Sequence, residues 1–172
     1  MQPLTDEMVC WFVARTRFGQ ELKIRDLLQQ GGVQHFIPTS EVVKVYAGRR
    51  RKIIKPLIPN LIFLRTNRKE ACDLVNFRAL PFKYLIDRMT HTLLRVPDRQ
   101  MEDFMRVLAD APEDALVTES VVAGDMVRVI GGNLKGVEGK VLTVQNKTYV
   151  VVDLCGLLQA RAVVPQAWLM KI

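Results

Sequence analysis

The sequence has few of the residues that build metal centres and disulfide frameworks. Its 172 residues include two histidines and three cysteines, the latter at positions 10, 72 and 155. The cysteines are odd in number, far apart and without nearby histidine pairs, so they indicate neither a disulfide framework nor a zinc site. We expect reduced cysteines, no metal and no cofactor.

Long hydrophobic runs are also missing. No segment approaches the length that a helix needs to cross a bilayer. The N-terminal residues MQPLTDEM lack a basic region followed by an apolar segment, which is the pattern of a secretory signal. The sequence therefore predicts a cytoplasmic protein with no membrane partner.

Catalytic motifs are absent from the sequence as well. It contains no glycine-rich phosphate loop, no histidine and glutamate at metal-binding spacing, and no serine or cysteine nucleophile with a plausible nearby base. Asp98 and Glu102 lie one helical turn apart, but acidic residues there are typical of a helix N-terminus. We do not expect an enzyme, and we name no catalytic residue.

Acidic residues are outnumbered by basic ones, and the excess is unevenly placed. The chain has 25 basic and 18 acidic side chains, a formal net charge of +7. Residues 1–109 hold 19 basic and 11 acidic side chains, residues 110–120 hold four acidic and no basic ones, and residues 121–172 hold six basic and three acidic ones. Contact with a polyanion is therefore a reasonable hypothesis for the N-terminal part.

The segment 37–65 combines apolar strand patterns with a cluster of positive charge. Residues 40–46 are rich in β-branched side chains, and residues 57–64 form an apolar run too short for an ordinary helix. We expect these two runs to be the arms of a long hairpin, with four consecutive cations at its tip: Arg49, Arg50, Arg51 and Lys52. The cations fit contact with phosphates, or alternatively a solvated sheet edge that is kept from pairing.

The first 110 residues alternate between strand and helix patterns. Strands are predicted at residues 9–15, 82–86 and 92–96, in addition to the hairpin. Helices are predicted at residues 20–30, after the cap-like Asn67, and from residue 98, where apolar residues recur on one face. This order predicts a layered α/β sandwich with a mixed or antiparallel sheet over residues 1–110.

The composition changes after residue 110. Residues 111–120 are acidic and small with little periodicity, which predicts a linker. Residues 121–172 contain six glycines and short alternating strands, a pattern typical of a small β-barrel.

Residues 122–141, VAGDMVRVIGGNLKGVEGKV, resemble the KOW motif, in which two strands and a glycine-bearing loop form one corner of an SH3-like barrel. We expect Gly124 to turn into the first strand, Val127 and Val129 to face the core, Gly132 to adopt a positive φ, and Gly139 to allow a tight bend. Alone, this motif indicates only a barrel found in several ribosomal and transcription proteins.

The whole chain is similar to the NusG family of transcription elongation factors. The resemblance rests on an aromatic first strand, IPTSEVV, the basic segment, PLIPNLIFL, a helix begun by VPD, and the KOW motif. It implies an α+β protein: an N-terminal NusG-type (NGN) α/β sandwich, a linker, and a C-terminal KOW SH3-like β-barrel. It also implies that the N-terminal domain binds the clamp helices of the largest RNA polymerase subunit, while the KOW domain recruits a second partner, a ribosomal protein or Rho.

Several residues resemble specialised paralogues more than the general factor. The family's usual Pro-Gly-Tyr is replaced by Pro59-Asn60-Leu61, which is similar to RfaH-type proteins. The segments PFKYLID (81–87) and VPDRQMEDF (96–104) resemble UpxY-type antiterminators of capsular polysaccharide operons. The expected function is antitermination on one such operon. The general pausing and Rho-coupling role, or a ribosome- or RNA-binding KOW protein, remain alternatives.

The resemblance also implies site residues. By position, the polymerase-binding surface comprises Phe12, Arg15, Leu57, Ile58, Leu61 and Phe63. Strand alternation puts Leu61 and Phe63 on one face and Ile62 on the other, but the sequence does not decide which face is core, and core packing explains each residue equally well.

The expected nucleic-acid contacts are to non-template DNA or nascent RNA, through Arg17, Arg49, Arg50, Arg51 and Lys52. A monomer fits a factor that travels with one polymerase. In RfaH the KOW domain can fold as a helical hairpin, but the many valines and glycines of residues 121–172 favour β structure here.

Overall fold

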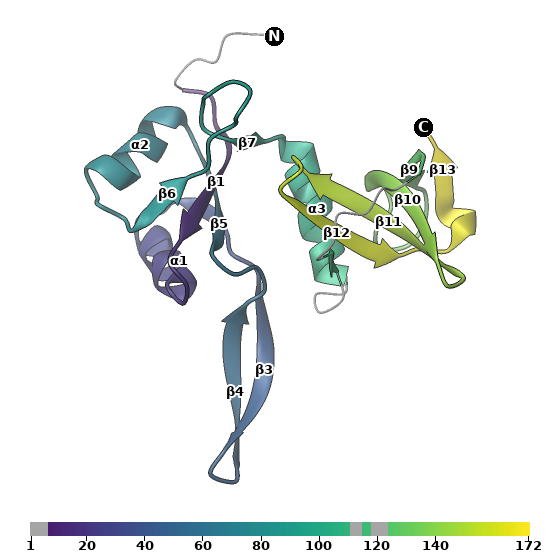
Figure 1. Cartoon of the computed structure of the whole chain (residues 1–172), viewed down its shortest axis with the longest axis horizontal. Coiled ribbons are helices and arrows are strands. Elements are labelled where there is room, and N and C mark those ends of the chain that lie inside the picture. The colour runs from purple at the N-terminus through teal and green to yellow at the C-terminus, as the bar shows by residue number, and fades with distance from the viewer. Residues whose placement is uncertain (1–6, 111–114, 118–123) are drawn as a thin grey trace. The chain divides into compact units, whose positions relative to one another are not determined.

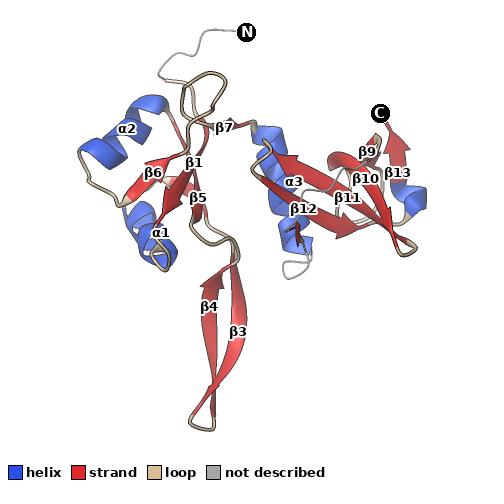
Figure 2. Ribbon diagram, viewed as in Figure 1, coloured by secondary structure: helices blue, strands red, loops and turns tan. Residues whose placement is uncertain are grey.

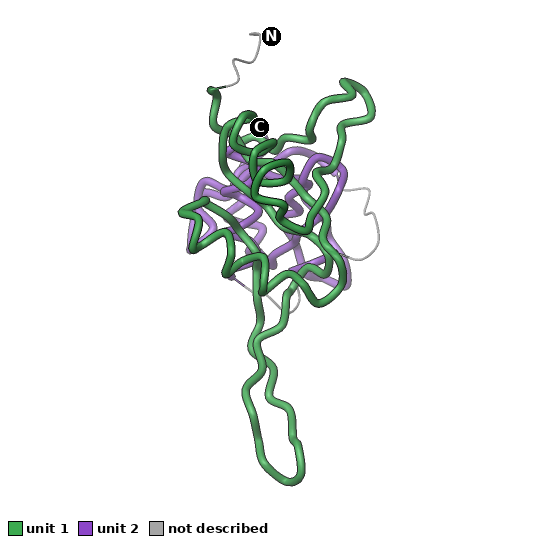
Figure 3. Tube along the Cα trace, turned by 90° about the vertical axis from the view of Figure 1, so that its left-hand side faces the viewer, with its two compact units in different colours: residues 1–97 green, residues 98–172 purple. Residues whose placement is uncertain are grey.

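The computed structural model describes residues 7–110, 115–117 and 124–172 (Figures 1 and 2). The chain divides into two compact units, Met1–Pro97 and Asp98–Ile172, which Figure 3 shows in different colours. Both units contain antiparallel sheets and helical elements. The predicted α+β class, with a β-rich C-terminal part, is confirmed.

Unit 1 is built on a sheet with β1 at its centre. Its strands pair in the order β2, β5, β1, β6, and β7 also pairs with β1. The elements are β1 (Cys10–Thr16), α1 (Glu21–Gln30), β2 (Gln34–Phe36), β3 (Thr39–Tyr46), β4 (Arg49–Pro56), β5 (Leu61–Thr66), α2 (Arg68–Asn76), β6 (Phe82–Tyr84) and β7 (Arg95–Val96). The short strand β2 has no counterpart among the strands predicted from the sequence.

The core of unit 1 lies between the sheet and its two helices. Ala14 of β1 pairs with Ile62 of β5, and both side chains join Ile24 and Leu28 of α1 and Leu74 of α2 in one buried cluster. The apolar faces of α1 and α2 thus pack against the side chains that alternate onto one face of β1 and β5. The predicted cap is also confirmed, since the Asn67 side chain accepts a hydrogen bond from the Glu70 N–H at 2.8 Å.

The hairpin differs from the one predicted. Strand β3 pairs with β4, so the basic residues form the second arm themselves, and the turn consists of Ala47 and Gly48 at φ values of 48° and 76°. Two consecutive positive φ values define a tight two-residue turn, which pairs Tyr46 directly with Arg49. The apolar run assigned to the second arm instead supplies β5, because pairing with β1 buries it.

The described residues of unit 2 form the α-helix α3, a short 3₁₀ helix and an antiparallel sheet. The elements are α3 (Asp98–Asp110), β8 (Leu116–Val117), β9 (Met126–Val129), β10 (Glu138–Val144), β11 (Lys147–Leu154), β12 (Leu158–Val163), the short 3₁₀ helix η1 (Gln166–Trp168) and β13 (Leu169–Lys171). The strands pair in the order β13, β9, β10, β11, β12, β8. The prediction of β structure in place of a helical hairpin is confirmed for the described residues.

Helix α3 packs on β11 and β12. Its apolar side chains Met101, Phe104, Val107 and Leu108 are buried. Three consecutive residues of β11, Val150 to Val152, are also buried, as expected for a strand covered on both faces. The sequence predicts a domain boundary after residue 110, whereas the compact units divide before α3.

The predicted linker, residues 111–120, lies largely outside the described residues. Its described part is Ala115, which is buried, and β8, which pairs with β12. Domain limits of 1–110 and 121–172 therefore stay a prediction. Within the described ranges, no helix is long and apolar enough to cross a membrane.

Candidate functional site

The central sheet of unit 1 separates the residues predicted to bind a partner. Arg15 pairs with Leu61, and Val13 with Phe63, so these side chains share the face opposite α1 and α2. Phe12 pairs with Leu64 and lies on the helix-covered face, with its ring 6.0 Å from that of Tyr84. The structure thus groups Arg15, Leu61 and Phe63 and puts Phe12 with the core.

Exposure differs strongly within this group. Arg15 is exposed, whereas Leu61 is 7% exposed and Phe63 is fully buried. Val13 and Phe36 belong to the same surroundings, since Val13 faces Phe63 across the strands and the Phe36 ring lies 6.1 Å from the Phe63 ring. Sequence reasoning missed both, because finding them requires the pairing register of β1, β2 and β5.

The loop before β5 is held by backbone hydrogen bonds. The Leu57 N–H donates to the Pro38 carbonyl at 2.8 Å, and the neighbouring Ile58 is buried. Asn60 has a φ of 63°, its N–H donates to Glu21 Oε1 at 2.8 Å, and its carbonyl accepts from the Thr16 N–H at 3.0 Å. Asparagine tolerates this left-handed conformation better than most residues. The conformation and hydrogen bonds of Asn60 therefore fix the residue at which β5 begins, Leu61.

The residues predicted to contact nucleic acid lie on two elements. Arg17 is exposed in the turn after β1, next to Phe18, which is 83% exposed, and Gly19, whose φ is 77°. Arg49, Arg50, Arg51 and Lys52 are consecutive residues of β4 and all exposed. Side chains alternate along a strand, so these four cations do not form one cluster but divide between the two faces of the hairpin.

In unit 2, the residues of the KOW-like motif have structural roles. The Gly124 N–H donates to the Val141 carbonyl at 2.9 Å, and Val127 and Val129 are buried as predicted. Gly132 has the predicted positive φ, 71°. Gly139 lies within β10, where a Cβ atom would come 2.4 Å from the Val151 carbonyl oxygen, so close approach of β11 requires this glycine.

A shallow groove of about 190 Å³ lies beside the 3₁₀ helix of unit 2. The half-exposed Trp168 stacks close to Gly131 and Gly132, and Leu134, Val164 and Pro165 complete its apolar wall. A Cβ atom on Gly132 would collide with the Trp168 ring at 2.4 Å. This contact explains why the loop carries two glycines there.

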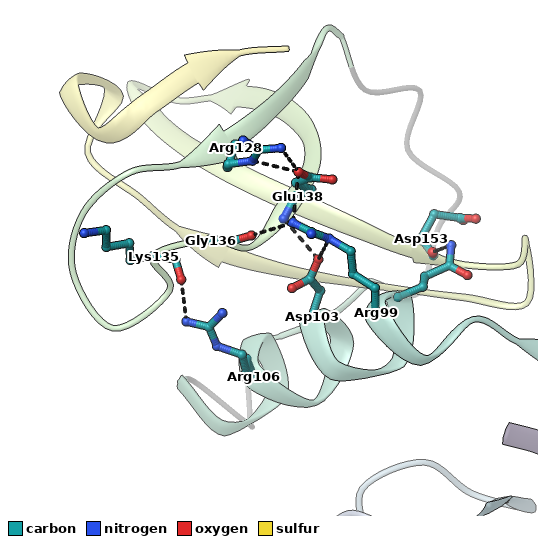
Figure 4. Close-up of polar contacts among 9 residues, drawn as sticks. Arg99, Asp103, Arg106, Arg128, Lys135, Gly136, Glu138 and Asp153 are labelled. Carbon is teal, nitrogen blue, oxygen red and sulfur yellow. Dashed lines mark hydrogen bonds and ion pairs between the residues drawn. The ribbon is translucent and has the colours of Figure 1, made fainter. Parts of the chain in front are cut away.

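Helix α3 is attached to the C-terminal sheet by a polar network (Figure 4). Arg99 forms an ion pair with Glu138 at 2.9 Å, and the Glu138 N–H donates to Asp103 Oδ2 at 3.2 Å. Arg106 donates to the carbonyls of Asn133 and Lys135, both at 2.8 Å. Burial raises the pKa of the Asp103 carboxyl, against the opposing effects of the Glu138 N–H and of nearby arginines.

No group of histidine, cysteine and acidic side chains suited to a metal ion occurs among the residues that the structure describes. The polar side chains that attach α3 bind backbone or each other. The cations of β4 are instead exposed, which suits contact with a polyanion. Two surfaces of unit 1 and one groove of unit 2 are thus the candidate binding sites.

Comparison with known proteins gives a family match that covers most of unit 1 and the first part of α3. Residues 9–105 match the family model NusG, described as "Transcription termination factor nusG". No curated protein sequence matches the chain significantly. The match ends within α3, although α3 packs with unit 2.

Two solved structures are similar to the chain. Thermotoga maritima NusG, from a structure titled "Domain interaction in Thermotoga maritima NusG", is 21% identical, with 96% of this chain and 98% of that chain covered and a TM-score of 0.48. A chain from the "MjSpt4:Spt5 complex conformation B" is 16% identical, with 94% and 96% covered and a TM-score of 0.29. At these scores neither likeness carries an argument beyond the family match.

Proposed function

The chain belongs to the NusG family of transcription factors, and on this premise we propose that it is an elongation and antitermination factor that binds RNA polymerase through unit 1. The observation that carries the proposal is the family match over residues 9–105, which includes every strand of the unit 1 sheet. The proposed contact on the polymerase is the clamp helices of its largest subunit.

The sheet face opposite α1 and α2 is the proposed polymerase-binding surface. Apolar side chains of β1 and β5, among them Leu61 and Phe63, gather there beside the exposed Arg15. An apolar sheet face that receives a helix is a common recognition mode. Because Leu61 and Phe63 are buried in this structure, the proposal requires that face to become accessible when polymerase binds.

We further propose that the factor acts on one operon, for capsular or exopolysaccharide synthesis, and does not serve as a general factor. The support is the resemblance of residues 81–87 and 96–104 to UpxY-type proteins and of Pro59-Asn60-Leu61 to RfaH-type proteins. Such a factor works in the cytoplasm as a monomer, and contacts to non-template DNA or nascent RNA help to load it. The general pausing and Rho-coupling role is the alternative within the family.

Unit 2 is the proposed recruiting module. Its apolar groove beside Trp168 supports this role, because an exposed tryptophan in a groove suits a protein partner. A ribosomal protein or Rho is the proposed partner. A pull-down with purified candidates, comparing wild type with Trp168→Ala, tests whether the groove is used.

Single-round transcription tests the function as a whole. The templates carry an intrinsic terminator and a Rho site, with and without a capsule-type leader, and the polymerase comes from the same cell. We expect readthrough that requires the leader and is lost in Leu61→Asp. Readthrough on every template would favour the general role, and absence of both readthrough and polymerase binding would favour an RNA-binding protein.

A loss of function in Leu61→Asp can also arise from misfolding, because Leu61 is buried. Photo-crosslinking avoids this difficulty. Arg15 is exposed and pairs with Leu61, so a photoreactive residue there reports on the proposed face, while one at the exposed Lys23 of α1 reports on the other side of the sheet. We expect polymerase crosslinks from position 15 only, and equal crosslinking from both positions would contradict the proposed surface.

A further inference from the structure

The β3–β4 hairpin has two chemically different faces. Directly paired residues of an antiparallel ladder lie on the same face, and neighbouring pairs alternate between faces. One face therefore carries the pairs Tyr46 with Arg49, Lys44 with Arg51, Val42 with Ile53, and Ser40 with Lys55. The other carries Val45 with Arg50, Val43 with Lys52, Glu41 with Ile54, and Thr39 with Pro56.

We call the first the basic face and the second the mixed face. The basic face contains four exposed cations, Lys44, Arg49, Arg51 and Lys55, and no acidic side chain. The mixed face contains two cations, Arg50 and Lys52, and one acid, with Lys52 Nζ 3.3 Å from Glu41 Oε2. Its remaining exposed side chains are the apolar Val43, Val45 and Ile54 and the small polar Thr39 at the base of the hairpin.

Unbalanced charge on the basic face favours an anionic ligand. Its four cations make no ion pair with any residue of the described ranges, and they repel one another across the ladder. A strand of phosphates would relieve that repulsion and would release counterions on binding. On the mixed face the ion pair with Glu41 already neutralises one of the two cations.

The aromatic residue of the hairpin lies among these cations. Tyr46 is 51% exposed and faces Arg49 across the ladder, on the basic face. An exposed aromatic ring beside phosphate-binding cations is the arrangement that binds single strands, because every unpaired base has a face that can stack. Paired bases in a duplex cannot stack on such a ring.

We propose that the basic face of the hairpin is a binding site for single-stranded nucleic acid, with phosphates held by Lys44, Arg49, Arg51 and Lys55 and a base stacked on Tyr46. The inference rests on the proposed function and sharpens its nucleic-acid contact. It adds Lys44, Lys55 and Tyr46 to the site and removes Arg50 and Lys52, which sequence alone had included.

Two double variants provide a matched test. Arg49→Ala/Arg51→Ala and Arg50→Ala/Lys52→Ala each remove two exposed positive charges from β4, on the basic and the mixed face respectively. Binding of the full chain to fluorescent oligo-dT and oligo-U is measured by anisotropy, without polymerase, over a series of salt concentrations. The same oligonucleotides annealed to their complements provide the duplex arm.

We expect the basic-face pair to weaken single-strand binding about tenfold or more at low salt, with the salt slope reduced by about 1.4, because each phosphate contact on a single strand contributes about 0.7. The mixed-face pair should leave the slope unchanged. Equal losses in both variants would overturn the division between faces. Loss in neither would overturn the site itself.

The tyrosine is tested separately. Tyr46→Ala should weaken single-strand binding about 5- to 150-fold, whereas Tyr46→Phe, which keeps the ring, should bind like wild type. Duplex binding equal to or tighter than single-strand binding, or insensitivity to Tyr46→Ala, would overturn the single-strand assignment.

Failure of this inference is distinguishable from failure of the proposed function. All oligonucleotide measurements omit polymerase, and polymerase crosslinking from position 15 does not involve the hairpin. Circular dichroism of each variant excludes misfolding, which is not expected since every substituted side chain is exposed.

Discussion

The β3–β4 and β10–β11 hairpins have similar turns and opposite surroundings. The β3–β4 turn has Ala47 and Gly48 at φ values of 48° and 76°, and the β10–β11 turn has Gln145 and Asn146 at 48° and 63°. Both turns therefore match the right-handed twist of their strands. Yet β4 is exposed over most of its length, whereas β11 is buried from Val150 to Val152.

The difference between the hairpins comes from side-chain pattern and not from turn geometry. Three consecutive valines allow β11 to be covered on both faces, one of them near α3. Four consecutive cations exclude β4 from any such interior, because burying unpaired charge is costly. The β10–β11 hairpin is thus part of the packed interior, while most side chains of the β3–β4 hairpin remain exposed on both of its faces.

The largest expected effect distinguishes glycines of the two hairpins. Gly139→Ala places a Cβ atom 2.4 Å from the Val151 carbonyl oxygen, so the β10–β11 pair must shift, and we expect a loss of about 2 kcal/mol in the free energy of unfolding of unit 2. Gly48→Ala meets no atom within 4 Å, and we expect only the cost of its positive φ, about 1 kcal/mol.

Urea denaturation followed by tryptophan fluorescence measures the Gly139 effect. In a Trp11→Phe background, Trp168 is the remaining tryptophan and reports on unit 2. An unchanged midpoint in Gly139→Ala would mean that β10 and β11 can separate without cost. A large shift in Gly48→Ala would contradict the independence of the exposed hairpin.

Sequence alone predicted the elements whose signals are local. The Asn67 cap, the positive φ of Gly132 and the β structure of the C-terminal part each follow from a few neighbouring residues. The prediction of the hairpin's second arm was wrong, because the apolar run ending in Leu64 is equally suited to pair with β3 or with β1. Only long-range packing decides between them, and the division of the cations between two faces depends on that choice.

The sheet against which α3 packs could not be predicted from neighbouring residues either. Its apolar face, with Phe104 at the centre, predicts burial but does not say which sheet buries it. The polar contacts that attach it to the C-terminal sheet use Arg99, Asp103 and Arg106, whose partners include backbone carbonyls that no sequence pattern identifies. The candidate partner surface could likewise be predicted only in part. Val13 belongs to it because β1 and β5 pair in a register that sets Val13 opposite Phe63, and the sequence does not reveal that register.

The β10–β11 hairpin contacts a buried acid of α3, Asp103, which accepts a hydrogen bond from the Glu138 N–H, so its stability should depend on pH. Burial raises the pKa of Asp103 above its usual 3.8, so the folded state binds more protons than the unfolded state just above that pH. Stability is therefore lost as the pH rises from 3.8 through the higher pKa of the folded state. In Asp103→Asn this loss is absent, although the ion pair with Arg99 is lost too.

We expect the stability of Asp103→Asn relative to wild type to rise as the pH increases from 3.8 towards neutrality, measured by urea denaturation at each pH. Asp110→Asn, the same substitution at an exposed position of α3, is the control. A parallel pH profile for Asp103→Asn and wild type would show that Asp103 does not titrate abnormally. Single-strand binding by the β3–β4 hairpin should not follow this profile.

The smallest expected effect concerns the two turns themselves. Ala47 occupies a left-handed conformation that alanine adopts at a cost, whereas Asn-Gly is the preferred pair for such a turn. Ala47→Asn should stabilise the β3–β4 hairpin by about 1 kcal/mol or less, and slow the hydrogen exchange of its amides. Global unfolding should hardly change, because the hairpin contributes little to the buried core.

Gln145→Asn is the matched change in the β10–β11 turn, and there any gain should appear in global unfolding, since that hairpin is part of the core of unit 2. In both variants, hydrogen exchange could instead slow only at the amides of the turn. That result would mean that the β10–β11 hairpin is no more strongly coupled to global unfolding than the exposed β3–β4 hairpin.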